Sequence, residues 1–222
     1  MFGESKWQDK VQGYEKLTDW LFEEGIPLDM IEHSFRFIKG QQRDWKESNM
    51  NLIKAALNHM NKVIDSAHRV GKRSAGLVIP YFAEKIGDVK YKGLCAENLL
   101  LLAEHVSPGF VLKALVKHGM TIKNPKVLQE LATMIETFLK EFGPGGFPLQ
   151  EVIAFAVQGC SASNPKVREA NIKMIVAIYS YVGDPIRDFL KDVKESTMKV
   201  IKDEFEKVTP NTGGAPKTTR QV

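Results

Sequence analysis

The sequence predicts an all-α fold, a HEAT-type helical solenoid of paired antiparallel helices, and three observations support this prediction. First, Asn124-Pro125-Lys126-Val127 recurs forty residues later as residues 164–167. Second, the apolar residues that follow each copy have the three-, four- and seven-residue offsets of one helix face. Third, the chain has no alternating apolar run with a tight hairpin turn, the pattern that would indicate strands. Helix pairs with a period near 40 residues are typical of HEAT and armadillo repeats, in which each pair buries its apolar face against its neighbours.

The same period organises most of the chain into helical segments. Their expected residue ranges are, in order, 9–24, 27–40, 45–70, 75–86, 89–106, 108–143 (one pair), 148–183 (one pair) and 185–208. Gly143 and Gly183 each end an expected helix, where glycine readily takes the left-handed conformation. Residues 1–208 are therefore predicted to form one repeat domain. Residues 209–222 contain no acidic residue and almost no apolar one, so we expect a flexible basic linker there.

The composition limits the classes of protein to which the chain can belong. Its 222 residues are 43% hydrophobic and carry a net charge of only +4, so a nucleic-acid binder is not indicated. The chain has no uninterrupted apolar run long enough to cross a bilayer and no signal-peptide core at its start, so we expect a soluble, intracellular protein without membrane contact. Cys95 and Cys160 lie in apolar surroundings, where buried free thiols are expected. Neither a cofactor nor self-association is expected.

Each turn inside a predicted helix pair carries a helix-capping residue followed closely by a lysine. The expected caps are Ser5, Asp44, Asp88, Asn124 and Asn164. The spacings of Ser5 with Gln8 and of Asp44 with Glu47 also fit a capping box. The lysines are Lys6, Lys46, Lys90, Lys126 and Lys166. One cation in the first turn of a helix opposes the helix dipole and is usually only a solvated side chain, but five at equivalent places predict a row of positive charge along one edge of the solenoid. We therefore expect this edge to dock an acidic protein surface.

Two of the three tryptophans fall in the same turns. Trp7 follows Lys6, and Trp45 precedes Lys46. Because tryptophan is frequent among interface hot spots, Trp7 is expected to be an interface anchor, whereas Trp45 fits either an anchor or a staple that packs on the next repeat. Trp20 lies in the middle of its expected helix and is predicted to be a core residue.

These turns resemble those of TOG domains, the tubulin-binding HEAT modules of the chTOG/Minispindles/Dis family of microtubule polymerases. The resemblance covers residues 5–208 and is carried by Lys6-Trp7, by residues 85–90 (Lys-Ile-Gly-Asp-Val-Lys) and by the two Asn-Pro-Lys-Val turns. Residues 44–49 and the ending 181–207 are most similar to the third TOG unit of such arrays.

The resemblance implies that the turns form one face that binds αβ-tubulin, with Trp7 on one subunit and the later basic turns on the other. The residues that it assigns to this face are Lys6, Trp7, Trp45, Lys46, Lys85, Lys90, Asn124, Lys126, Asn164, Lys166 and Arg168. It also implies a role in microtubule growth at plus ends and spindle poles. Residues 8–10 (Gln-Asp-Lys) depart from the family, in which a more basic run is common here.

Three other functions are compatible with a helical repeat protein. An enzyme is disfavoured, because the five histidines are scattered and Gly143-Pro144-Gly145-Gly146 lacks the lysine and the preceding strand of a phosphate-binding loop. A HEAT scaffold for another acidic protein is the main alternative, but such scaffolds more often bind along the concave helical surface. Binding of nucleic acid through the basic turns would show a steep dependence on salt.

Overall fold

The computed structural model describes residues 6–210, and every regular element in this range is helical. The elements are α1 (Trp7–Glu23), α2 (Leu28–Gln41), α3 (Met50–Ser66), α4 (Lys72–Lys85), α5 (Lys92–Val106), α6 (Pro108–Gly119), α7 (Pro125–Phe142), α8 (Leu149–Cys160), α9 (Pro165–Val182), the 3-10 helix η1 (Asp184–Phe189) and α10 (Glu195–Phe205). None of these helices is both long enough and apolar enough to cross a membrane.

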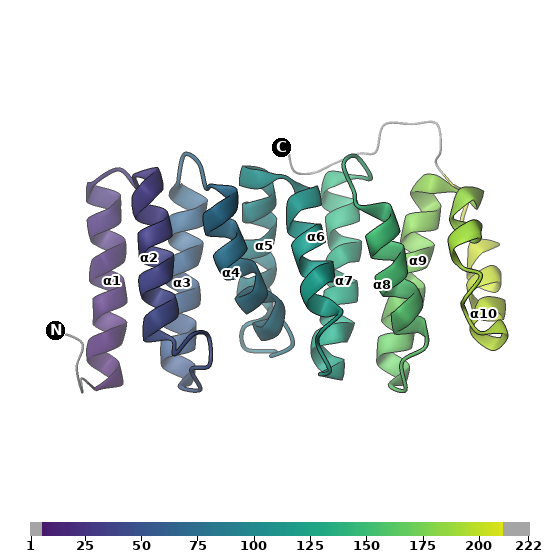
Figure 1. Cartoon of the computed structure of the whole chain (residues 1–222), viewed down its shortest axis with the longest axis horizontal. Coiled ribbons are helices and arrows are strands. Elements are labelled where there is room, and N and C mark those ends of the chain that lie inside the picture. The colour runs from purple at the N-terminus through teal and green to yellow at the C-terminus, as the bar shows by residue number, and fades with distance from the viewer. Residues whose placement is uncertain (1–5, 211–222) are drawn as a thin grey trace.

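The helices form two layers that run along the long axis of the molecule (Figure 1). In one layer α1 packs on α3, α3 on α5, and α7 on α9, whereas in the other layer α2 packs on α4, α4 on α6, and α6 on α8. At the C-terminal end, η1 and α10 both pack on α9. This arrangement confirms the predicted solenoid, because each helix pair buries its apolar face mainly against the pairs beside it.

The two Asn-Pro turns have the structure that their sequence predicts. The Asn124 side chain accepts a hydrogen bond from the backbone N–H of Lys126 at 3.0 Å, and Asn164 accepts one from Lys166 at 2.9 Å. Proline then occupies the first position of α7 and of α9, where no N–H donor is needed. Gly143 and Gly183 end these helices with φ angles of 73° and 68°, a left-handed conformation that suits glycine.

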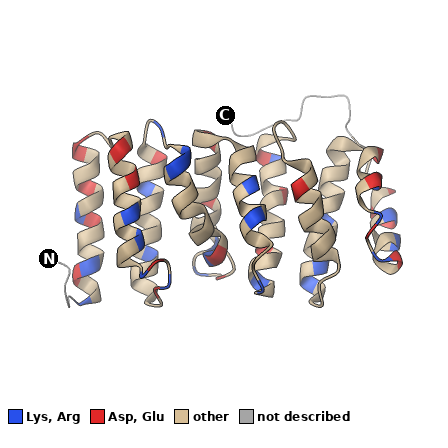
Figure 2. Cartoon of the chain, viewed as in Figure 1, with Lys and Arg blue, Asp and Glu red and all other residues tan. Residues whose placement is uncertain are grey.

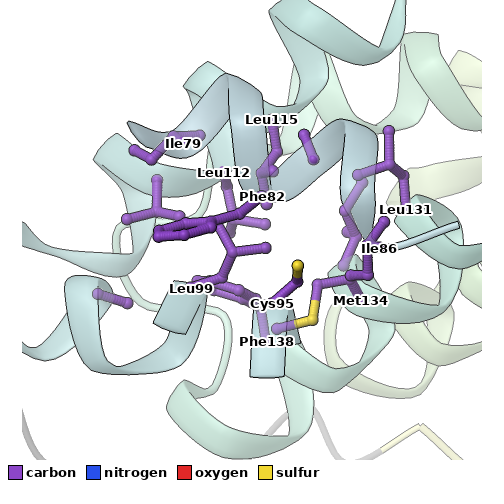
Figure 3. Close-up of a cluster of buried hydrophobic side chains, with 14 of the residues drawn as sticks. Ile79, Phe82, Ile86, Cys95, Leu99, Leu112, Leu115, Leu131, Met134 and Phe138 are labelled. Atoms are coloured by element: carbon purple, nitrogen blue, oxygen red, sulfur yellow. The ribbon is translucent and has the colours of Figure 1, made fainter. Parts of the chain in front are cut away.

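The middle of the core lies between the two layers and is built from α4 to α7. Phe82 of α4 packs with Leu99 of α5, Leu112 of α6 and Phe138 of α7, and the Cys95 thiol lies among them (Figure 3). Burial raises the pKa of the Cys95 thiol to about 12 and that of Cys160 to about 11, so both stay protonated near neutral pH. The expectation of two free, buried thiols is confirmed.

Trp20 is not a core residue, contrary to the prediction. Its side chain is 42% exposed, although it lies in the middle of α1 between buried residues such as Thr18 and Leu21. The reason is the position of α1 at the end of the solenoid, where it packs on α2 and α3 but has no described helix on its other side. A terminal helix buries only one side, so a central position along the helix does not ensure burial.

His59 connects α1 to α3 through a buried hydrogen-bonded chain. The Thr18 hydroxyl donates to the backbone oxygen of Tyr14 at 2.7 Å, and His59 Nδ1 lies 2.7 Å from the same hydroxyl, which makes Nδ1–H the donor in that contact. The imidazole is only 2% exposed, and burial lowers its pKa to about 4. The histidine is therefore neutral in the folded protein at pH values where an unfolded histidine is protonated.

Stability is expected to fall as the pH is lowered from about 7.5 to about 5, with His59 contributing about 2 kcal/mol to the loss. Between the ordinary histidine pKa of 6.5 and the folded value near 4, the unfolded chain binds more protons, so acid favours unfolding. Urea unfolding curves at the two pH values measure the loss. In His59→Asn, which keeps a donor for Thr18 but does not titrate, the pH effect should shrink by about that amount, and an equal pH effect in both proteins would contradict the assignment.

Candidate docking edge

The four turns inside the helix pairs all lie at one edge of the solenoid. In Figure 1 the connections α2–α3, α4–α5, α6–α7 and α8–α9 are at the lower edge, where α1 also begins, and the connections between pairs are at the upper edge. This is the alignment that the period of the helix pairs predicts. We call the lower row the turn edge, and it consists of residues 6–7, 42–49, 86–91, 120–124 and 161–164.

Neighbouring parts of the turn edge contact one another, so it is a surface rather than a set of separate loops. Lys90 Nζ lies 2.8 Å from the sulfur of Met50 at the start of α3, and the Tyr91 hydroxyl donates to the Met50 backbone oxygen at 3.4 Å. On its other side the same turn approaches α7 so closely that a Cβ at Gly87 would lie 2.6 Å from Val127 Cγ2. A glycine is therefore needed at this position for the turn to pack on the next pair.

Figure 2 shows Lys or Arg positions recurring along the lower edge, with acidic positions among them. Five of the lysines predicted for this edge are exposed, namely Lys6, Lys46, Lys90, Lys126 and Lys166. None of these five forms an ion pair with a described residue. Lys85 is half-buried, with Nζ 5.5 Å from the centre of the Tyr81 ring. The edge therefore presents unpaired positive charge to solvent.

The expected position of each lysine in the first turn of a helix, directly after a cap, is correct only for Lys126 and Lys166. Lys46 and Lys90 lie in the turns before α3 and α5, which begin later than predicted, and Lys6 is itself the residue before α1. Of the five predicted lysines, only Lys126 and Lys166 thus lie in the first turn of a helix, against its dipole. Ser5, the expected cap of α1, lies outside the described residues.

Asp44 does not cap a helix, contrary to the prediction. Arg43, Asp44 and Trp45 have φ angles of 52°, 54° and 71°, so the chain makes a left-handed turn here instead of starting a helix. The cap of α3 is Asn49, whose side chain accepts from the N–H of Asn51 at 3.0 Å. The spacing of Asp44 and Glu47 matches a capping box, but a capping box also requires a helix to start here. The positive φ angles prevent that start.

Glu47 stabilises the same turn from inside. Its carboxylate is buried and accepts hydrogen bonds from the backbone N–H groups of Ser48 and Asn49, both at 2.8 Å. Burial by itself would raise the pKa of this carboxyl, but the two backbone bonds and the charge of Arg43 outweigh burial and lower the pKa. Glu47 is therefore ionised near neutral pH. Its carboxylate stabilises the turn by accepting backbone hydrogen bonds and does not form a capping box with Asp44.

Asp88 likewise acts within its turn instead of capping α5. Its side chain accepts from the N–H of Lys90 at 2.9 Å, and its backbone oxygen accepts from Tyr91 and Lys92. Because α5 begins at Lys92, Asp88 lies too far upstream to cap it. The hydrogen bond fixes the backbone of Lys90, whose side chain is exposed on the edge.

The two tryptophans of the turn edge have different surroundings. Trp7 is 39% exposed at the start of α1. Trp45 is half-buried, its ring is stacked on Tyr81 with centroids 4.2 Å apart, and its indole N–H donates to the backbone oxygen of Leu77 at 3.3 Å. The sequence left open whether Trp45 is an interface anchor or a staple on the next repeat. These contacts are those of a staple, because they fasten the α2–α3 turn to α4.

Arg168 is half-buried just inside α9, and its guanidinium holds the last turn in shape. Its Nη1 donates to the backbone oxygens of Ala162 and Ser163, at 2.8 Å each. Both carbonyl groups belong to the turn, where no helical N–H donates to them, so the guanidinium supplies their hydrogen bonds. The side chain therefore has a structural task here in addition to the docking role that the sequence predicts.

Exposed apolar side chains on the turn edge were missed by the sequence reasoning. Met50 is 55% exposed, Val89 is 92% exposed and Met120 is 46% exposed, and each belongs to or adjoins a different turn. Together with Trp7 they place one exposed apolar group at each of four successive corners. The signal in the sequence was an apolar residue among turn residues, as in Gly87-Asp88-Val89-Lys90, where no core position is expected. Tryptophan and methionine are enriched at protein interfaces, so these exposed apolar side chains favour a protein-binding role for the edge.

The described residues contain no group of three or more His, Cys, Asp and Glu side chains that could hold a metal ion. The histidines occupy separate structural positions. His59 bonds Thr18, and His105 Nε2 lies 2.7 Å from the backbone oxygen of Ile64. In the described part of the chain, the candidate binding site is therefore the surface of the turn edge and not a metal site.

Comparison with known proteins identifies the family of this fold. Residues 2–205 match the family described as "XMAP215/Dis1/CLASP, TOG domain". Among individual proteins, the chain is 31% identical over 177 residues to the protein MOR1 of Oryza sativa subsp. japonica, covering 79% of this chain and 9% of the relative. It is also 26% identical over 220 residues to the protein mini spindles of Drosophila melanogaster, covering 96% of this chain and 10% of the relative. The chain thus spans about a tenth of the length of these relatives.

Solved structures agree with the sequence matches. The third TOG domain of Drosophila melanogaster Mini spindles superimposes with a TM-score of 0.81 at 25% identity, covering 99% of this chain and 95% of that one. A structure from work on TOG–tubulin binding specificity, microtubule dynamics and mitotic spindle formation shares the fold, with a TM-score of 0.79 at 16% identity over 92% of this chain and 79% of that one. The predicted resemblance to a third TOG unit is confirmed. The chain belongs to the XMAP215/Dis1/CLASP family of TOG domains.

Proposed function

We propose that this chain is a tubulin-binding module that docks αβ-tubulin through its turn edge and serves a protein that promotes microtubule growth. Trp7 contacts one tubulin subunit, and the basic turns that contain Lys126 and Lys166 reach the other. The module acts by holding its partner and performs no catalysis. Its place of work is the cytoskeleton, at microtubule plus ends and at spindle poles or centrosomes.

The properties of the relatives support this assignment. One structural neighbour comes from work on TOG–tubulin binding, and the names of relatives refer to spindles and centrosomes. The turn edge itself supports it in a second way, since unpaired lysines attract an acidic surface from a distance while an exposed indole supplies apolar contact area at close range.

The single observation that carries the proposal is the alignment of exposed Trp7 and five exposed lysines without ion pairs along one edge of the solenoid. Trp7 and the five exposed lysines belong to or adjoin the turn edge, as do Met50, Val89 and Met120, which are exposed as well. The docking set is the one named from the sequence, extended by these three apolar residues. Within it, Trp45 and Arg168 maintain the shape of their turns, and the exposed lysines meet the partner.

Co-elution of the chain with αβ-tubulin on gel filtration tests the proposal directly. We expect a complex at low salt that weakens by about tenfold in Kd as the ionic strength rises from about 0.05 M to about 0.2 M, because exposed charge pairs are screened. The apolar contacts keep some affinity at the higher salt. Measurement at high protein concentration is needed, since a single TOG unit can bind weakly.

Two results would point away from tubulin. No complex at any salt, even at high concentration, would favour a HEAT scaffold for a different acidic protein. Binding to DNA that falls steeply with salt, without a tubulin complex, would favour a nucleic-acid partner.

A further inference from the structure

A second group of cations lies at the edge of the solenoid opposite the turn edge. Arg69 belongs to the α3–α4 connection, and Lys72 and Arg73 are the first two residues of α4. All three are exposed, and Figure 2 shows Lys or Arg positions at this connection and at the start of α4. The chain has no acidic residue between Asp65 and Glu84. The corner therefore carries three positive charges within five residues, and its own segment supplies no carboxylate.

The start of α4 favours a bound anion. Lys72 and Arg73 lie in the first turn, where cations oppose the helix dipole, and this turn contains no acidic residue. The residue before the helix is Gly71, which has no side chain to accept hydrogen bonds from the first N–H groups. A carboxylate placed here would meet two cations and N–H groups that no side chain caps.

The cationic surface continues onto the two helices beside α4. On one side α4 packs on α2, where Arg36 and Arg73 share the carboxylate of Glu32, at 2.8 Å and 3.3 Å. One carboxylate therefore faces two guanidinium groups. On the other side α4 packs on α6, and Lys72 Nζ lies 5.8 Å from the centre of the Phe110 ring at the start of α6. The cations at the start of α4 thus connect α2 with α6.

These cations and one from α6 form a row across three neighbouring helices. We call it the outer basic row, and it consists of Arg36, Arg69, Lys72, Arg73 and Lys113. Neighbouring helix axes are about 8–10 Å apart, so the row from α2 to α6 is about 20 Å long. A fully extended peptide advances about 3.3–3.6 Å per residue and would cover that length with about six residues.

Acidic residues limit the row at both ends. Beyond α2, Glu23 and Glu24 are exposed at the α1–α2 corner, and Asp29 is exposed at the start of α2. Beyond α6, Glu151 of α8 lies 3.2 Å from Lys113 Nζ. A long polyanion such as duplex nucleic acid would continue onto these carboxylates and be repelled. A short acidic segment would end before it reaches them.

We propose that the outer basic row binds a short acidic segment of a protein in an extended conformation. Carboxylates of the segment pair with Arg69, Lys72 and Arg73, and one of them meets the N–H groups at the start of α4. The turn edge fits such a segment less well, because none of its corners places three Lys or Arg residues within five positions. The inference goes beyond the proposed function and does not depend on it, because it concerns the opposite edge and is tested without tubulin.

Fluorescence anisotropy with a labelled octaglutamate peptide tests the proposal. At an ionic strength of about 0.05 M the wild type should bind the peptide, and Arg69→Glu with Lys72→Glu should raise Kd by about tenfold or more. A glutamate in the first turn of α4 is favoured by the helix dipole, so the variant should keep its thermal midpoint and the loss would not come from unfolding. A wild type that does not bind, or a variant that binds as tightly, would overturn the proposal.

Lys126→Glu with Lys166→Glu makes the same change in charge on the turn edge. Both lysines lie in the first turn of a helix, as Lys72 does, and this second variant should bind octaglutamate within about threefold of the wild type. A loss as large as that of the first variant would mean that the peptide binds the turn edge or responds only to net charge, and would contradict the outer basic row. Labelled octathymidylate is the second probe, and tighter binding of it than of octaglutamate would assign the row to nucleic acid instead.

Discussion

The double substitution Trp7→Ala with Lys90→Glu is expected to weaken binding to αβ-tubulin by about 100-fold or more, with no change in helical content. Loss of an indole that is an interface hot spot typically costs about 2 kcal/mol or more, and reversal of a lysine charge adds repulsion from an acidic partner. The sum of about 3 kcal/mol corresponds to about two orders of magnitude in Kd. Titration of the chain with αβ-tubulin, together with circular dichroism of the free variant, measures both quantities.

Neither side chain belongs to the buried core, so the helices should survive both substitutions. Trp7 is 39% exposed at the first position of α1. The Lys90 side chain is exposed and contacts the Met50 sulfur, while its backbone is held by Asp88 regardless of the side chain. Reduced binding in the variant would therefore report on the partner contact itself.

The chain offers a matched control on the same first helix. Trp20 of α1 is 42% exposed, close to the value for Trp7, but it lies away from the turn edge, and Lys199 of α10 is exposed at the far end of the solenoid. Trp20→Ala with Lys199→Glu makes the same change in composition and charge and should leave the tubulin affinity within about twofold of the wild type. If the control loses as much affinity as the test variant, or the test variant loses none, the interface lies on another surface.

The parts of the structure that the sequence predicted well are those with a repeated local pattern. Asn124 and Asn164 cap helices, proline follows each of them, and Gly143 and Gly183 end the same helices, because cap and turn preferences depend on a few neighbouring residues. The forty-residue period also places the turns on one edge, since helix pairs of nearly equal length bring the chain back to the same side. Fold and location of the candidate site both follow from these regularities.

The parts that were predicted wrongly depend on contacts with distant residues. Nothing near Asp44 in the sequence indicates three consecutive residues with positive φ, a conformation that is costly for residues other than glycine. The turn keeps this backbone because Glu47 satisfies its N–H groups and Trp45 packs on Tyr81, which lies 36 residues away in the sequence. Trp20 was wrongly placed in the core because its local pattern cannot show that no described helix packs on the outer side of α1.

Trp45→Ala is expected to destabilise the fold by about 2–3 kcal/mol, a value near the low end for the removal of a large aromatic side chain because Trp45 is half-buried. The substitution removes the stack on Tyr81 and the indole bond to Leu77, which together anchor the left-handed turn to α4. The thermal midpoint should fall by about 5–10 °C. Urea unfolding of the variant and the wild type at neutral pH gives the free energy directly.

Trp45→Phe separates the two contributions of the indole, because phenylalanine can keep the stack but cannot donate to Leu77. It should lose only about 1 kcal/mol, the usual net value of one hydrogen bond. Below the unfolding transition Trp45→Ala should retain most of its tubulin affinity, whereas Trp7→Ala should lose affinity and keep its stability. The opposite result, a stable Trp45→Ala that no longer binds, would mean that the exposed part of Trp45 meets tubulin directly and that its packing on Tyr81 contributes little to the fold.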